Sequence, residues 1–144
     1  MDTYIFTYET TVDAPIEEVW SFFRTAENLV KITSFPTITL HSDPETREGN
    51  TIRMKMGLGP VGSDWHSYIQ EVKPHEYFVD VGVKLPFPLK SWRHTHSFVK
   101  RGDSTVMRDN VEIQSILPTS ILRLALHGMF RGRADAVRRH FNRL

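Results

Sequence analysis

The sequence contains no cysteine, and this absence excludes several kinds of chemistry at once. A chain without cysteine has no disulfide framework, no thiolate metal site and no cysteine nucleophile. Histidine and carboxylate side chains are therefore the candidates for any reactive or metal-ligating group. The chain has seven histidines and 17 acidic residues, so candidates of both kinds are present.

Long apolar runs are also missing. No segment approaches the roughly 20 consecutive apolar residues that cross a bilayer, and the polar, aromatic N-terminus lacks the order of a signal peptide. The simplest expectation is a cytoplasmic protein. No repeat, low-complexity tract or linker divides the 144 residues, and a hydrophobic fraction of 40% is enough for one globular core. We therefore expect a single domain over residues 1–144.

Strand-like alternation dominates the first 117 residues. Residues 3–12 alternate Tyr4, Phe6 and Tyr8 against threonine and glutamate, which predicts a half-buried strand. Two short helices are expected next, in "DAPIEEVWSFF", with a proline at its start and two glutamates in its first turn, and in "TAENLVKIT". Six further segments alternate or carry β-branched runs between turns rich in glycine, proline, asparagine and aspartate. These segments predict a meander of antiparallel strands.

The last 27 residues, 118–144, switch to helical periodicity and predict a long amphipathic helix. They contain six arginines and one aspartate, although the whole chain carries a net charge of only +1. Four of the arginines lie on the outward face: Arg131, Arg138, Arg139 and Arg143. A solvated face is the simplest interpretation, and weak contact with an anionic membrane stays open. Nucleic acid is not expected as a partner, because no aromatic residues interleave with the arginines.

A strand, two helices, a meander and a terminal helix describe an α+β fold in which a curved antiparallel sheet wraps around the C-terminal helix. This order, with "VDAPIEEVWSFF" near the start and "SWRHTHSF" then "STVMRDNVEI" before the final helix, resembles the SRPBCC or helix-grip superfamily. That superfamily includes START lipid-binding domains, plant pollen-allergen-like proteins and polyketide cyclases. The sequence is most similar to its small bacterial ligand-binding members, in which the pattern Trp-x-His-x-His-x-Phe recurs. The resemblance implies a hollow between the sheet and the C-terminal helix, and it leaves a wide choice of functions.

The stretch "SWRHTHSF" places two histidines among aromatic residues on one face of a strand: Trp92, His94, His96 and Phe98. The next strand follows after Gly102 and Asp103, a pair suited to a two-residue type II′ turn. This turn fixes the register of the hairpin and hence the residues that share its inner face. The opposed pairs are Phe98 with Met107, His96 with Asp109, His94 with Val111, and Trp92 with Ile113.

Three interpretations of these histidines stay open. In the first, His96 and Asp109 form a hydrogen-bonded pair in a packed core, and His94 bonds to a serine, a backbone carbonyl or water. In the second, the same groups border a cavity and orient the polar end of a ligand. In the third, His96 or His94 is a general acid–base, Asp109 orients it, and Arg133 or Trp92 positions the substrate.

A metal site is a further alternative, because a His-x-His strand can direct two imidazoles at one zinc ion and Asp109 could be the third ligand. The other histidines, His66 among them, have no spacing that commits them to the same face. Two histidines alone are weak support for a metal. The sequence therefore predicts neither a metal nor a cofactor.

Other segments are expected near the same hollow. Met54 and Met56 alternate on one strand, and methionine suits an adaptable apolar pocket as well as an irregular core. Phe87 lies between two prolines in "KLPFPLK", where it could close the mouth of a pocket or cap the sheet.

Two polar residues break the apolar stripe of the terminal helix, Arg133 and His140. A kink at Gly128 or Gly132 could rotate the later turns, or the arginine stem could lie on apolar surface with its head in water. Alternatively, Arg133 is directed into the hollow as the partner of an anion or polarised carbonyl on a ligand.

The sequence thus predicts a binding protein for a small hydrophobic molecule with one polar end, of lipid, polyketide or aromatic type. The alternative is an enzyme similar to polyketide cyclases or dehydratases, which would use a histidine–aspartate pair in the same cavity. Neither the natural ligand nor the oligomeric state follows from the sequence. The residues expected to contact the ligand are Met54, Met56, Phe87, Trp92, His94, His96, Met107, Asp109, Val111, Met129 and Arg133.

Overall fold

The computed structural model describes residues 2–33, 36–58 and 61–142. Arg143, which was expected on the outward face of the terminal helix, lies outside this part of the chain. Seven strands and three helices are found in the described residues. In chain order they are β1 (Tyr4–Val12), α1 (Ile16–Phe23), α2 (Ala26–Ile32), β2 (Thr37–Leu40), β3 (Thr51–Leu58), β4 (Val61–Lys73), β5 (Tyr77–Lys84), β6 (Leu89–Arg101), β7 (Ser104–Ser115) and α3 (Thr119–Phe141).

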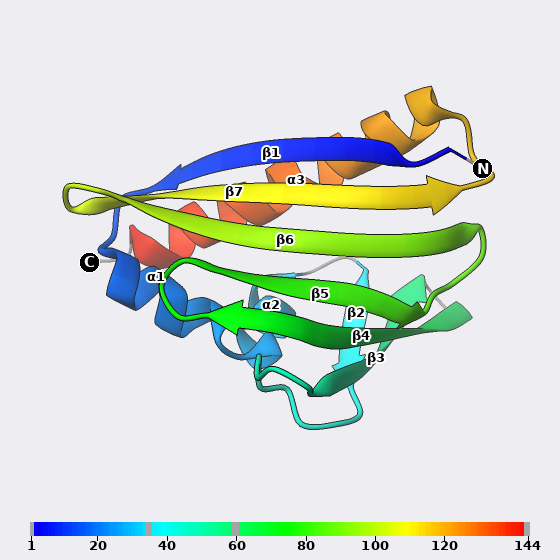
Figure 1. The fold of residues 1–144 in the computed structure, drawn as a ribbon, viewed down its shortest axis with the longest axis horizontal. Coiled ribbons are helices and arrows are strands. Elements are labelled where there is room, and N and C mark those ends of the chain that lie inside the picture. Colours follow the sequence, from blue (N-terminus) through cyan, green and yellow to red (C-terminus); the bar gives the residue numbers. More distant parts are fainter. Residues whose placement is uncertain (1, 34–35, 59–60, 143–144) are drawn as a thin grey trace.

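The seven strands form one antiparallel sheet in the order β1-β7-β6-β5-β4-β3-β2. β2 to β7 are a meander in which each strand pairs with the next, and β1 joins the free edge of β7. Figure 1 shows α3 crossing behind the sheet, with α1 and α2 near the C-terminal end of α3. The predicted α+β arrangement, with two short helices after the first strand and a long C-terminal helix on the sheet, is confirmed.

The β6–β7 hairpin has the predicted register. Arg101 pairs with Ser104 across a two-residue loop, and His96 is opposite Asp109. Gly102 has a φ of 60°, which a type II′ turn requires at its first central residue. The turn sequence therefore determined which side chains of these two strands share the inner face.

Irregular pairing occurs between β4 and β5 and at the start of β6. The register shifts twice between β4 and β5, between His66 and Ser67 and between Ile69 and Glu71, and once between β6 and β7 near Leu89. Bulges of this kind bend a strand and increase its twist. They favour the curvature that lets one sheet enclose a helix.

The long helix α3 follows Pro118 and continues as one helix through both glycines, Gly128 and Gly132. Its buried side chains recur every three or four residues, which directs one face at the sheet: Leu122, Leu126, Phe130, Ala134 and Val137. The outward arginines Arg131, Arg138 and Arg139 are exposed, as expected. In the described residues, no helix has the length and apolar character needed to cross a membrane.

Three apolar clusters fill the space between the sheet and the helices. The first packs α1 against Phe98 and Met107 of the β6–β7 hairpin. The second packs the N-terminal half of α3 against β1, β6 and β7. The third lies between α2 and the strands β2 to β4. Residues of the second and third clusters border a cavity that the apolar side chains leave open.

Candidate ligand-binding site

A cavity of about 630 Å³ lies between α3 and the sheet. Small-molecule sites in proteins have volumes of about 300 to 1,000 Å³. Residues from all three helices and from β2 to β7 line the cavity, and most of them are apolar. Its aromatic lining residues include Trp65 and Trp92, whose ring centroids are 5.0 Å apart in an edge-to-face arrangement. The hollow expected from the sequence is therefore present.

The structure brings most of the predicted contact residues to this cavity. Those that line it are Met54, Met56, Trp92, His94, His96, Met129 and Arg133. The methionines come from β3 and α3, which face each other across the cavity.

Four predicted contact residues are not among the described residues that line the cavity. Met107 and Val111 share the inner face of the hairpin, but apolar neighbours from α1 and α3 cover them. Asp109 lies beneath the two histidines and Arg133, which contact it from the cavity side. Phe87 is 77% exposed, with the Lys90 ammonium 5.7 Å from its ring centroid. The structure therefore does not bring these four residues to the cavity surface.

The two histidines of β6 present stacked imidazole rings, with centroids 3.5 Å apart. His94 Nε2 is 2.8 Å from Asp109 Oδ1, and His96 Nε2 is 2.7 Å from Asp80 Oδ2. The hydrogen bond between His96 and Asp109 that the first interpretation contained is therefore not formed, although these residues are opposite each other in the register. The reason is that the His96 ring leans toward β5 and stacks on Phe78, at a centroid distance of 4.0 Å.

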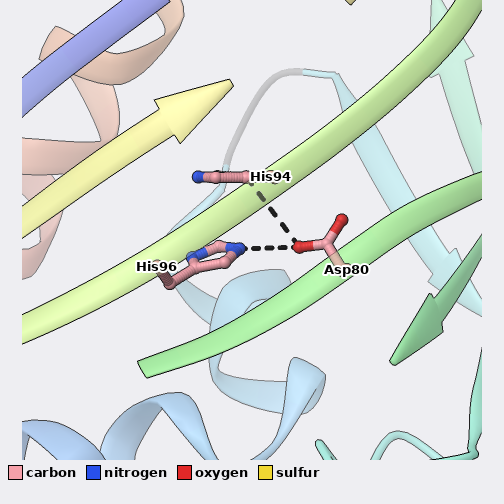
Figure 2. A group of neighbouring side chains, drawn as sticks. All are labelled: Asp80, His94 and His96. Atoms are coloured by element: carbon pink, nitrogen blue, oxygen red, sulfur yellow. Dashed lines mark hydrogen bonds and ion pairs between the residues drawn. The ribbon is translucent and has the colours of Figure 1, made fainter. Parts of the chain in front are cut away.

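Asp80 is a member of this cluster that the sequence analysis missed. It lies on β5, opposite His94 of β6, and Figure 2 shows its carboxylate directed at both imidazole rings. Ser67 Oγ of β4 donates to its other oxygen over 3.1 Å. A signal was present, because Asp80 is the one charged residue in the apolar stretch "YFVDVGV" and shares a strand face with Phe78.

Arg133 is directed inward and not at solvent. Its guanidinium donates to Asp109 Oδ2 and lies 4.8 Å from the ring centroid of Phe130 and 5.8 Å from that of Phe23. The side chain is only 12% exposed. Of the alternatives left open for Arg133, the structure shows the inward one, and the anionic partner belongs to the protein. His140, in contrast, is exposed and packs on Phe22 at a centroid distance of 4.5 Å.

The surroundings of the cluster determine its charge state. Burial acts to raise the pKa of Asp109, but the Arg133 guanidinium and the hydrogen bond from His94 outweigh it and hold this pKa well below its usual value. Burial also opposes ionisation of Asp80, whose pKa is nevertheless lowered by the hydrogen bond from His96 and by its electrostatic interactions with His96 and His94. Both carboxylates are therefore ionised at neutral pH.

His96 is neutral under the same conditions. Burial, followed by the proximity of His94, lowers the pKa of His96 to about 4. Its Nε2–H group then donates to the ionised Asp80 carboxylate. Its Nδ1 atom is buried and has no hydrogen-bond partner among the described residues, the Asp109 Oδ1 atom being 3.6 Å away. One polar atom of the cluster is thus left unsatisfied, which is uncommon for buried nitrogen.

This arrangement allows three kinds of chemistry. The carboxylate of Asp80 and the imidazole of His96 can bind the polar end of a ligand, because both line the cavity. Each histidine–carboxylate hydrogen bond has the form of a general base with its orienting group. Asp80, His94 and His96 also offer donor atoms that lie within 4.8 Å of one another.

Comparison with known proteins finds similar structures but no match at the level of sequence. No protein-family model and no curated protein matches the chain. Among solved structures, norcoclaurine synthase from Thalictrum flavum is similar over 99% of this chain and 88% of its own, with a TM-score of 0.74 and 16% identity. One structure of that enzyme holds dopamine and hydroxybenzaldehyde.

Two bacterial proteins are similar to the same extent. A protein from Nitrosospira multiformis is 14% identical over 97% of both chains, with a TM-score of 0.75. An uncharacterized protein from Bacillus thuringiensis is 12% identical over 96% of this chain and 98% of its own, with a TM-score of 0.76. At these identities the likeness concerns the backbone alone. The chain therefore has the helix-grip fold that the resemblance of its sequence implied.

Proposed function

We propose that the protein binds a small hydrophobic molecule with one polar end, which enters the cavity between α3 and the sheet. The observation that carries this proposal is the cavity of about 630 Å³ itself, with an apolar lining and its buried charged groups concentrated around the β6 histidines. An apolar body would be transferred from water to apolar walls, which contributes about 25 cal/mol per Å² buried. The norcoclaurine synthase complex supports the proposal by analogy, because a similar backbone there holds small aromatic molecules.

The charges of the cluster favour one type of polar end. Arg133 is already paired with Asp109, so it is not free to receive an anion. The second carboxylate, Asp80, lines the cavity and accepts hydrogen bonds from Ser67 and His96. A ligand end that donates hydrogen bonds, such as a hydroxyl or an ammonium group, therefore fits better than a carboxylate. This differs from the anion that the inward arginine indicated at the level of sequence.

A series of probes with one alkyl chain tests the proposal. Dodecylamine, dodecanol and dodecanoic acid can be titrated while tryptophan fluorescence is recorded, since Trp65 and Trp92 line the cavity. The amine and the alcohol are expected to change the emission and to bind more tightly than the acid. Native mass spectrometry of the purified protein should show the same one-to-one complexes. No spectral change and no complex with any probe would contradict binding in the cavity, and preference for the acid would contradict the proposed polarity.

The enzyme alternative is supported by the His96–Asp80 hydrogen bond of 2.7 Å on the cavity wall. A neutral imidazole held by a carboxylate can accept a proton from a substrate, as general bases do. Replacement of His96 by asparagine is expected to abolish turnover of a cyclisable polyketide or aromatic aldehyde and to leave ligand binding largely intact. The matched control is His66→Asn, because His66 lies on β4 between the cavity-lining residues Trp65 and Ser67 and hence on the opposite face. Loss of folding in the His96 variant alone would indicate a structural role instead.

A further inference from the structure

Three side chains on adjacent strands direct oxygen and nitrogen donors at one region of the cavity wall. Asp80 comes from β5, and His94 and His96 come from β6, as Figure 2 shows. The Asp80 Oδ2 atom is 2.7 Å from His96 Nε2 and 3.9 Å from His94 Nδ1. Ligand atoms on one tetrahedral zinc ion are about 3.3 Å apart, given bonds of about 2.0 to 2.2 Å. We propose that Asp80, His94 and His96 form a binding site for a divalent transition-metal ion such as Zn²⁺.

The outer nitrogen of His94 is already held as metal sites require. His94 Nε2 lies 2.8 Å from Asp109 Oδ1, where an N–H can donate to this carboxylate, and Nδ1 is the ring nitrogen on the side of Asp80. A metal-bound imidazole almost always donates its second N–H to a carboxylate, a carbonyl or water, which fixes the tautomer. Asp109 is held in turn by the Arg133 guanidinium. The Asp109 carboxylate is therefore already in position to orient the His94 ring.

The unsatisfied nitrogen of His96 is a second, independent indication. Without a metal, the His96 proton lies on Nε2 and bonds to Asp80, and the buried Nδ1 atom has no hydrogen-bond partner in the described part of the chain. When a metal replaces the proton on Nε2, the proton moves to Nδ1. That N–H then faces Asp109 Oδ1, 3.6 Å away. Metal binding would thus turn an unsatisfied acceptor into a donor directed at a carboxylate, at a separation just beyond hydrogen-bond length.

Charge balance favours a cation at this position. Asp80 and Asp109 are two buried carboxylates, and Arg133 is the guanidinium paired with one of them. With neutral imidazoles, which are the form that binds metals, these groups carry one excess negative charge. A divalent ion reverses the excess to one positive charge. The oxygen of a water-derived hydroxide would then restore neutrality.

The proposed site leaves a coordination position open. Asp80, His94 and His96 supply three ligands, and all three line the cavity. Zinc sites with three protein ligands and one open position are the catalytic type, whereas structural sites are closed by four ligands. Two imidazoles and a carboxylate also suit Fe²⁺ or Co²⁺. The open position faces the space in which we propose that the organic ligand binds, but the metal site does not depend on that ligand.

Titration of metal into untagged protein, stripped with a chelator and dialysed, tests the site without any organic molecule. Isothermal titration with Zn²⁺ is expected to show one ion per chain, and Co²⁺ should produce visible absorption bands of a nitrogen- and oxygen-ligated ion. X-ray absorption at the zinc edge should show two imidazoles. The variants Asp80→Asn and His96→Gln should each weaken binding at least about tenfold, since even loss of an outer partner costs 10- to 100-fold.

The control variant is His66→Gln, which removes an imidazole from the opposite face of β4 and should leave the affinity unchanged. Circular dichroism and urea midpoints establish whether each variant is folded. If a variant is unfolded, the stoichiometry and X-ray absorption of the wild type still test the proposal. Absence of saturable one-to-one binding in the wild type would overturn the proposal. Unchanged affinity in both ligand variants would also overturn it. Failure of the metal site would leave binding of the alkyl probes untouched, so the two proposals are tested separately.

Discussion

The Nε2 atom of His94 lies 2.8 Å from Oδ1 of Asp109, and the second oxygen of the same carboxylate accepts from the Arg133 guanidinium. One buried carboxylate thereby connects β6, β7 and α3 behind the cavity wall. The side chain of Asp109 is almost fully covered by these contacts. Because water does not reach this carboxylate, its negative charge is stabilised by its protein partners alone.

Replacement of Arg133 by methionine is expected to lower the free energy of unfolding by about 3 to 5 kcal/mol, because it leaves the Asp109 charge buried without its cation. Adding Asp109→Asn in the same chain should recover part of this loss, since the double variant buries no unpaired charge. Urea denaturation of the single and double variants measures both effects.

The control for this prediction is Arg108→Ala on β7, the strand that carries Asp109. Arg108 pairs with Glu9 over 2.9 Å, but both side chains are more than half exposed. Exposed ion pairs contribute about 0 to 1 kcal/mol, so this variant should stay close to the wild type. An Arg133 variant as stable as the Arg108 variant would show that the buried pair does not stabilise the fold.

Much of the fold could be predicted because its signals are local in the sequence. Alternation identified the strands, and the Gly102–Asp103 turn determined the β6–β7 register through a two-residue loop. The helical phase of α3 correctly directed Arg133 toward the sheet. Each of these inferences needs only neighbouring residues and the period of the element.

The details of the site depend on side-chain directions that register alone does not determine. His96 is opposite Asp109 yet bonds to Asp80, because its ring leans toward Phe78 on the other neighbouring strand. The four-residue connection between β5 and β6 (residues 85–88) has no unique turn type, so the pairing of Asp80 with His94 could not be derived. Alternation also shows which side chains face inward, but not whether they border a cavity or lie in the packed core. Met107 and Val111 were therefore assigned to the cavity, although they lie in the core.

A glycine substitution tests the hairpin turn. Gly102 has a φ of 60°, and no described heavy atom would lie within 4 Å of an added Cβ outside its chain neighbours. The cost of Gly102→Ala is therefore conformational and should be about 1 to 2 kcal/mol. Thermal and urea denaturation measure it. A variant as stable as the wild type would mean that the loop takes a different turn conformation.

The same substitution should have the opposite sign within α3. Gly132 is in the interior of the helix, and an added Cβ would meet no described heavy atom within 4 Å beyond the adjacent helix backbone. Glycine in a helix interior costs about 0.5 to 1 kcal/mol relative to alanine, so Gly132→Ala should raise the free energy of unfolding by a similar amount. Urea denaturation of the Gly132 and Gly102 variants under the same conditions compares their free energies of unfolding. A destabilised Gly132 variant would show that α3 bends or is closely packed at this position.

The cavity itself is tested by filling it. Met54 of β3 is buried and lines the cavity, so in Met54→Trp the larger side chain should enter space that is already open. Binding of dodecylamine and dodecanol should weaken at least about tenfold, because the indole removes room for the alkyl chain; this corresponds to about 1.4 kcal/mol. Stability should not fall, since the indole gains contacts without displacing others. Fluorescence is not suitable for a new tryptophan, so calorimetry is the appropriate measurement.

The matched control is Lys55→Trp, which places the same side chain on the exposed face of β3 and should leave the affinity unchanged. The two variants differ by one position along the strand, so their side chains point to opposite faces. Insertion of a larger side chain into a well-packed core costs about 1 to 3 kcal/mol. A loss of that size in Met54→Trp would mean that the space beside Met54 is filled, and it would remove the basis for ligand binding at this wall. If Met54→Trp keeps its stability but loses affinity, and Lys55→Trp keeps both, the result supports an open cavity beside Met54.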